Sequence, residues 1–380
     1  FFHTFGLFVI QQAGLRILQQ SHDGGEAYFR LQSTRGEDIL DTLSARVELN
    51  KVGEILRLYC KALTGRNLSI QTTATLTEKG IGWVDQGKAS TEGTTIFLPE
   101  VMERYTEKDE NFAAIKVFAT HQAARLEFGS FEFRFATPPA VFEDSRAALV
   151  EGRENAAVTD IERFFDLFPD RQLASDLFTV VEDGRIDAAI RREYGGIRKP
   201  LKRMQKAALE HRPDIRRMPL RTAFVENLVR ASLDGASAIL FPSNRQTEMA
   251  QGLGLLNAVD VDGALVEDSA EATLRLYTLA MSIPNVFEGN DDIEWDSVEP
   301  MEGMERSMMD ASGELGGGQS GEMQPGDVGE GEEQYASPED VDYRGDFKPE
   351  LVQLLMKLRE NAQGGDAGEM SPTPLTEEQL

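Results

Sequence analysis

The chain has 380 residues and a formal net charge of −26, with 65 acidic side chains against 39 Lys and Arg. This excess of negative charge argues against nucleic-acid binding, because phosphate contacts need clustered Lys and Arg. The single cysteine, Cys60, excludes an internal disulfide and a metal site built from cysteines. The longest apolar run near the start, residues 5–10, is too short to cross a bilayer. We therefore expect a cytoplasmic protein without a membrane span.

The first third of the chain predicts one helix and a small β-sheet. Apolar residues recur at three- to five-residue steps over 36–64, which favours a helix, and Gly65 is placed to end it. The runs 67–75 and 94–98 are rich in Thr and Ile and lie among glycines, a pattern typical of strands and turns. We expect the small sheet at about 66–98.

A helical array follows the expected sheet. Residues 111–128 contain neither Gly nor Pro and are apolar on nearly every side, which predicts a buried helix. Further helices are expected at 160–168, 171–194, 199–210, 219–233 and 270–281. The predicted fold class is α+β and predominantly helical: a small sheet followed by a helical array that resembles a degenerate zincin (zinc metallopeptidase) core.

The C-terminal quarter has a different composition. Residues 286–345 contain 18 acidic side chains against Arg306 and Arg344, a net charge of −16, and lack apolar periodicity. Low hydrophobicity with high charge predicts a disordered acidic linker there. A short helix is expected at 349–359, within a tail of residues 346–380 that leads to a further domain outside this chain. The expected domains are thus 1–285, 286–345 and 346–380, and a start at Phe1 indicates a piece of a longer protein.

His121 and Arg125 form the sharpest chemical motif of the chain. They lie four residues apart on the predicted buried helix, the spacing at which a zinc metallopeptidase places two histidines. Gln122 stands where the general base would be and cannot accept a proton, and Arg125 cannot ligate a cation. Glu182, on a later predicted helix, is placed as a third ligand would be. Two ligands hold zinc poorly, so a bound metal is not expected.

Two interpretations of these residues remain open. The Arg125 guanidinium could occupy the place of a metal and pair with Glu182, because a buried carboxylate needs a positive partner. Alternatively, Arg125 is a surface residue and His121 a core histidine with a hydrogen-bond partner.

A basic stretch provides a candidate docking surface. Residues 185–221 carry 12 Lys and Arg against four acidic side chains, a net charge of +8. An acidic partner could dock there, and the candidate residues are Arg185, Arg191, Arg192, Arg198, Lys199, Lys202 and Arg203. A set of solvated helix surfaces is the simpler explanation, because charge runs usually are that.

Several motifs in order resemble the N-terminal region of the NorD/CbbO group of von Willebrand factor A domain proteins. They are ALTGR (62–66), TIFLP (95–99), AxHQAxxxEFGSFEF (119–133), DLFTVVEDGRIDAAIRREYGGIR (176–198) and VEDSAEATLRLY (266–277). The likeness extends over about 36–281 and then through an acidic linker. Arg125 departs from the family pattern, which tends to have a second histidine there.

The resemblance implies a non-catalytic adaptor or chaperone. Such proteins direct a hexameric MoxR-type AAA+ ATPase to a client metalloenzyme, as in the activation of nitric oxide reductase or Rubisco. No cofactor is expected in this chain, whereas the C-terminal A domain of the family normally binds a metal such as Mg²⁺. The alternatives are a divergent zinc-dependent hydrolase that uses His121 and Glu182, and a structural scaffold without an ATPase partner.

Overall fold

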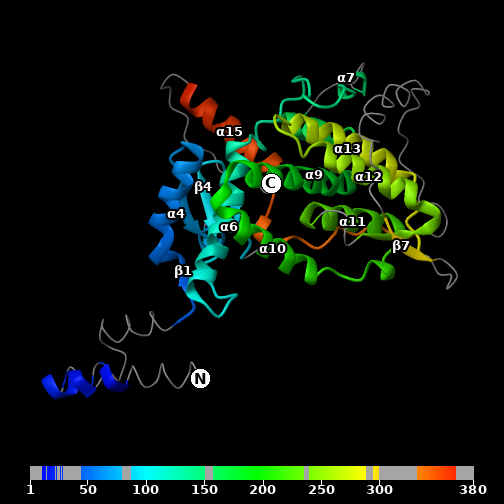
Figure 1. The fold of residues 1–380 in the computed structure, drawn as a ribbon. Helices are drawn as coiled ribbons and strands as arrows, with labels where there is room; N and C mark the ends of the chain where they lie inside the picture. The colour runs from blue at the N-terminus through cyan, green and yellow to red at the C-terminus, as the bar shows by residue number, and fades with distance from the viewer. Residues whose placement is uncertain are drawn as a thin grey trace.

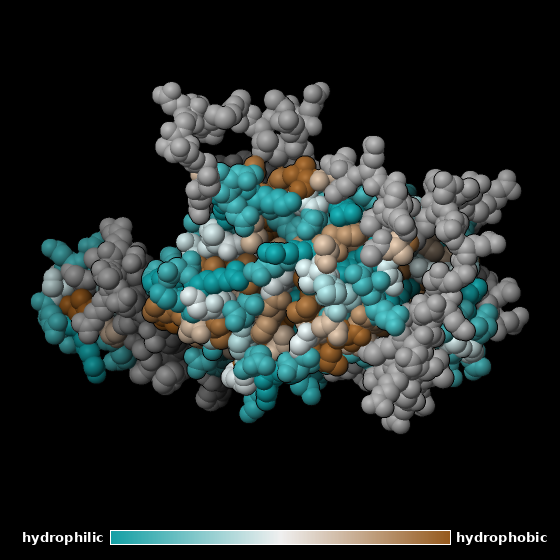
Figure 2. Space-filling view, turned by 90° about the horizontal axis from the view of Figure 1, so that it is seen from above, coloured by the Kyte–Doolittle hydropathy of each residue, from teal (hydrophilic) through white to brown (hydrophobic). Residues whose placement is uncertain are grey.

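The computed structural model describes most of the chain, including all of the predicted helical array. The described residues are 11–13, 15–21, 23, 26, 28, 44–78, 87–149, 157–234, 239–287, 294–298 and 332–364. Within them α-helices predominate, and the strands form one three-stranded and two two-stranded sheets. No helix in these ranges is both long and apolar enough to cross a membrane. Hydrophilic side chains cover much of the face seen in Figure 2, with apolar side chains gathered in small areas.

The N-terminal layer combines one amphipathic helix with the predicted small sheet. Its elements are β1 (Val47–Glu48), α4 (Leu49–Thr64), β2 (Ser69–Thr72), α5 (Ala74–Glu78), β3 (Ser90–Thr91), β4 (Thr95–Leu98) and β5 (Val101–Met102). Strand β2 pairs in parallel with β4, and β3 pairs antiparallel on the other side of β4. The two predicted strands are confirmed.

Helix α4 ends where the sequence predicts but begins later. Gly65 has φ 65° and donates its N–H to the Lys61 carbonyl, so glycine is required at this C-terminal cap. The predicted start at residue 36 is wrong as far as the structure describes it, because residues 47–48 pair as β1 with β5 and the helix begins at Leu49. Residues 36–43 lie outside the described part of the chain.

Helix α6 (Lys108–Glu127) is the central helix and confirms the prediction for 111–128. Thirteen of its residues are buried, from Asn111 to Leu126, because neighbours pack on every side. In Figure 1 it lies between the N-terminal layer and the helical array. Helices α4 and α9 both pack against it.

The helical array packs around α9. Its elements are α7 (Arg146–Leu149), α8 (Asp160–Phe165), α9 (Arg171–Glu193), α10 (Arg198–Glu210), α11 (Leu220–Asp234), β6 (Leu240–Pro242), α12 (Gln246–Ala258), α13 (Val266–Met281) and β7 (Trp295–Ser297). Helix α9 contacts α6, α11 and α13. Helix α12 was not predicted, since its two glycines obscured the pattern. Gly252 is needed there, because a Cβ atom would lie 2.7 Å from Phe224 Cζ.

Residues 332–364, which we call the return segment, fold back into the body. The segment contains a 3₁₀ turn (Asp342–Arg344) and α15 (Pro349–Gly364), and α15 confirms the expected helix at 349–359. Tyr343 and Arg344 are only 1% and 2% exposed. The prediction of a disordered linker over 286–345 is therefore wrong for 332–345, where apolar and cationic side chains bury into the core. It is also wrong for 294–298, which contain strand β7, paired with β6. Residues 288–293 and 299–331 lie outside the described part of the chain.

Candidate functional site

Two helices bring four of the site's side chains together. His121 and Arg125, one turn apart on α6, are fully buried and face Asp183 and Asp187, one turn apart on α9. Residues four apart share one face of a helix, so each helix presents a pair to the other. Sequence reasoning had identified the pair on α6 but not the pair on α9.

Arg125 pairs with Asp183, not with Glu182. Its Nη2 donates to Asp183 Oδ1 at 2.6 Å, and its Nη1 donates to the Asp346 carbonyl at 3.1 Å. The guanidinium also lies 4.5 Å from the centre of the Phe347 ring. The prediction that Arg125 pairs with Glu182 is therefore wrong, and so is the alternative of a surface arginine.

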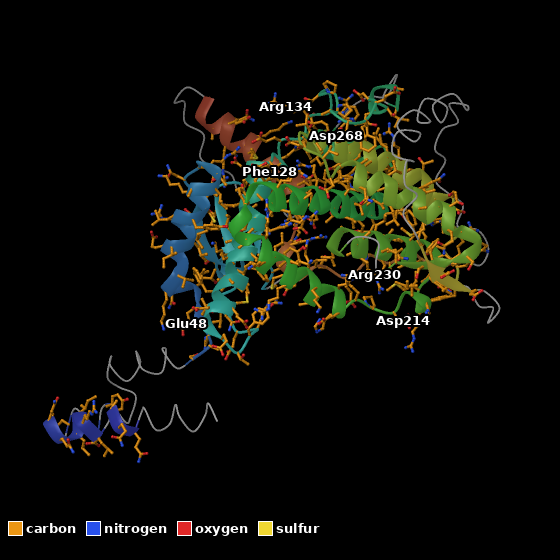
Figure 3. All side chains as sticks on the ribbon, in the orientation of Figure 1. Glu48, Phe128, Arg134, Asp214, Arg230 and Asp268 are labelled. Carbon is orange, nitrogen blue, oxygen red and sulfur yellow. The ribbon has the colours of Figure 1, made fainter. Side chains whose placement is uncertain are left out.

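Glu182 belongs to a neighbouring ion pair. Its carboxylate accepts hydrogen bonds from Arg185 Nε at 2.8 Å and Nη2 at 2.6 Å, and from the hydroxyls of Ser130 (2.5 Å) and Ser269 (2.7 Å). Burial alone would raise the pKa of Glu182, but Arg185 and the two hydroxyls outweigh it and hold the pKa below its usual value. Arg185 also donates at 3.0 Å to the carbonyl of Phe128, which is labelled at the end of α6 in Figure 3.

The return segment completes the site at Asp187. Asp187 Oδ2 accepts hydrogen bonds from Tyr343 Oη at 2.5 Å, Arg344 Nη2 at 2.7 Å, Arg344 Nε at 3.1 Å and Gln205 Nε2 at 3.3 Å. Gln122 Nε2 in turn donates to the Arg344 carbonyl at 2.7 Å. A segment more than 150 residues away in sequence thus supplies the counter-charge of Asp187.

His121 lies between the two aspartates without a hydrogen bond. Its Nε2 is 3.5 Å from Asp187 Oδ1 and 4.0 Å from Asp183 Oδ1. Within the described residues, neither ring nitrogen nor Asp187 Oδ1 has a hydrogen-bond partner. Burial, reinforced by Arg125 and Arg344, holds the pKa of His121 well below its usual value. The imidazole is therefore neutral, and the charges around it are two guanidiniums and two carboxylates.

This arrangement does not assemble a metal-ligand set. Among the described residues, no group of three His, Cys, Asp or Glu side chains is placed to hold a metal ion. The Arg125 and Arg344 guanidiniums neutralise the two carboxylates, which raises the energetic cost of placing another cation there. The buried network can hold the α6–α9 interface and the return segment in a fixed arrangement, since paired and hydrogen-bonded charges are costly to separate.

The predicted docking residues fall into two groups. Arg185 is only 3% exposed and paired with Glu182, so its place on a docking surface was wrongly predicted. Arg191 and Arg192 contact Asp260, and Arg203 pairs with Glu110 at 2.6 Å. Arg198 donates to the carbonyls at positions 191 and 192. Lys199 and Lys202 on α10 are exposed, as is Lys206 one turn further. These three make no ion pair with another described residue.

Sequence reasoning missed Asp183, Asp187, Tyr343 and Arg344. The i, i+4 spacing of the two aspartates, matching that of His121 and Arg125, could have identified them. For the return segment, the one usable signal was that Arg344 interrupts an acidic run beside an aromatic residue.

No protein-family model, no curated protein and no solved structure gives a significant match.

Proposed function

We propose that this protein is a non-catalytic cytoplasmic adaptor that couples a hexameric MoxR-type AAA+ ATPase to the activation of a client metalloenzyme, such as nitric oxide reductase or Rubisco. One observation carries the proposal. Three motifs of the NorD/CbbO resemblance, far apart in sequence, meet at one buried carboxylate: Ser130 and Ser269 both donate to Glu182, which pairs with Arg185. If the motifs were chance similarities, nothing would require them to meet in one network. Their meeting therefore supports a fold shared with that group.

The chemistry of the buried residues favours an adaptor over a zinc hydrolase. Both oxygens of Glu182 already accept hydrogen bonds from arginine and serine. Gln122, at the position of the general base, donates to a backbone carbonyl and cannot take up a proton. A hydrolase needs an open coordination position and a base, and these residues are engaged in holding the fold.

The exposed lysines of α10 are our candidate contact to the ATPase. Lys199, Lys202 and Lys206 recur at three- and four-residue steps along α10 and project from one side of it. Clustered unpaired cations steer association with an acidic surface and add specificity. The ATPase should therefore present carboxylates at the contact.

A co-purification experiment tests the proposal. The chain is immobilised and incubated with the MoxR-type ATPase and nucleotide; we expect the hexamer to be retained. Changing Lys199, Lys202 and Lys206 together to Glu should reduce retention at least tenfold. The control is Arg66→Glu, which alters an exposed arginine outside α10. No retention of the hexamer by the chain would overturn the adaptor assignment.

Metal analysis tests the alternative separately. An adaptor of this kind should purify without stoichiometric zinc. One equivalent of zinc, lost in His121→Ala, would instead favour the hydrolase.

A further inference from the structure

Helix α4 presents an apolar strip to solvent on the side opposite the core. Successive residues of an α-helix turn by about 100°, so Leu49, Leu56 and Cys60, which are buried, share one side. Ile55, Leu58 and Ala62 lie on the other side, and Ile55 and Leu58 are 58% and 57% exposed. In Figure 1 α4 lies at the left-hand edge of the main body, on the side away from the helical array.

We propose that this strip is a dimer interface, in which α4 of one copy packs antiparallel against α4 of a second copy. The strip consists of Lys51, Ile55, Leu58 and Ala62, at steps of four, three and four residues, which is the spacing of a helix–helix seam. In an antiparallel pair, Ile55 of each copy lies against Leu58 of the other. The aliphatic stem of Lys51 then covers Ala62 of the other copy.

The charges beside the strip are self-complementary in this orientation. Glu54 and Lys61 lie seven residues apart on the same flank of the strip, and both are exposed. One oxygen of the Glu54 carboxylate accepts from Arg57 on the same helix at 3.0 Å, which leaves the other for a partner across the interface. Antiparallel pairing places Glu54 of each copy opposite Lys61 of the other, so two ion pairs form about the two-fold axis. An isologous interface requires a surface that complements itself in this way.

A parallel arrangement fits the same residues poorly. It would place Lys51 against Lys51 at the seam, where like charges repel. It would also set Glu54 beside Tyr59, whose hydroxyl is hydrogen-bonded to Thr120 at 2.9 Å and whose ring is covered by Lys116. The antiparallel arrangement is therefore favoured. Because the strip is short, the dimer should form reversibly as the protein concentration rises.

Sedimentation velocity of the full chain over a range of concentrations tests the interface. We expect a concentration-dependent shift from monomer to dimer, which Leu58→Glu or Ile55→Glu abolishes. The matched control is Leu358→Glu, since Leu358 on α15 is 47% exposed and lies outside the strip; this variant should dimerise as the parent does. Circular dichroism of each variant verifies that the fold is retained.

Charge exchange tests the register. Glu54→Lys or Lys61→Glu alone should weaken the dimer several-fold, and combining them should restore it. Mixing the two single variants should give a heterodimer. A chain that stays monomeric at all concentrations, or a dimer that survives Leu58→Glu, would overturn the proposal. A dimer that is insensitive to the charge exchange would overturn the antiparallel register.

Discussion

At the residue scale, two Arg–Asp ion pairs flank a neutral histidine at the centre of the molecule. Arg125 comes from α6 and Arg344 from the return segment, while Asp183 and Asp187 both come from α9. In each pair, the attraction between the two charges compensates the free-energy cost of removing them from water. The buried histidine, which makes no hydrogen bond, adds a further free-energy cost. The network therefore gives specificity of packing, and each of its charges depends on its partner.

Removal of one buried charge should be strongly destabilising. Arg125→Ala leaves Asp183 without its nearest partner, so we expect a loss of about 3–5 kcal/mol in the free energy of unfolding. Urea denaturation followed by circular dichroism measures it. The matched control, Arg66→Ala, removes an exposed ion pair with Glu132 and should change stability by less than about 1 kcal/mol. Equal effects of the two changes would contradict the structure.

The neutral state of His121 predicts a pH dependence. Because its folded pKa lies below its unfolded pKa of about 6.5, the unfolded chain binds the extra proton, and stability should fall as pH drops below about 6.5. The slope is at most about 1.4 kcal/mol per pH unit for one proton. The charged and titratable groups around the ring are Arg125, Asp183, Asp187, Tyr343 and Arg344.

A His121 variant separates the contribution of this histidine to the pH dependence from the contribution of Asp183. Burial raises the pKa of Asp183 in the folded chain, so that group acts in the opposite sense, at lower pH. His121→Gln should remove the extra slope of the free energy of unfolding between pH 6.5 and 5.5. The pH dependence below pH 5.5 should remain. Parallel curves for parent and variant over that interval would show that the imidazole binds protons equally in the folded and unfolded chain, and would contradict its lowered pKa.

The sequence predicts the buried helix and the pair of His121 and Arg125 on it. The partner that it predicts for Arg125 is Glu182, which directly precedes the partner found in the structure, Asp183. Adjacent residues of a helix point about 100° apart, so the choice depends on the rotation of α9 about its axis. Packing against α11 and α13 sets that rotation, and the local sequence does not encode it.

At the element scale, long periodic helices were predictable and short contact-dependent elements were not. Helices α6, α9, α10, α11 and α13 follow from their own periodicity. Strands β1 and β7 contain two and three residues, and each exists through pairing with a distant strand. Residues 332–345 resemble the acidic run before them except at Tyr343 and Arg344, and it is mainly their tertiary contacts that distinguish them.

Gly345 is the point on which docking of the return segment depends. It has φ +67°, and an added Cβ would lie 2.1 Å from the Ala89 carbonyl oxygen, so a side chain collides with backbone. Gly345→Ala should displace residues 341–347 and lower the unfolding midpoint. It should also increase amide exchange at Tyr343 and Arg344. Gly196→Ala is the control, because a Cβ there meets nothing within 4 Å. Unchanged exchange in Gly345→Ala would contradict the described docking.

At the scale of the whole molecule, residues that follow the acidic stretch pack back onto the body and complete it. In the return segment, Asp346 donates its backbone N–H to the Ala89 carbonyl beside the sheet, and Glu350 pairs with Arg171 of the array. Gln353 donates to a carbonyl in the loop after α6. The N-terminal domain predicted as 1–285 is thus completed by residues 332–364. The rest of the domain prediction, including a further domain beyond this chain, stays a prediction.

Cleavage of the chain should leave the body intact. A site-specific protease sequence inserted at positions 316–318 permits a single cut between the body and the return segment. We expect both fragments to co-elute in size-exclusion chromatography, because buried charges and aromatic rings hold them together. In Arg344→Ala the C-terminal fragment should dissociate more readily. Separation of the parent fragments under native conditions would contradict the packing of the return segment.

The adaptor function is the central claim, and equilibrium binding to the ATPase tests it most directly. The measurement is interferometry of immobilised chain with the MoxR-type hexamer at low and at high salt. The account predicts saturable binding that weakens as salt rises, since exposed charges are screened, and that is lost when Lys199, Lys202 and Lys206 are changed to Glu. Absence of binding at low salt would contradict it.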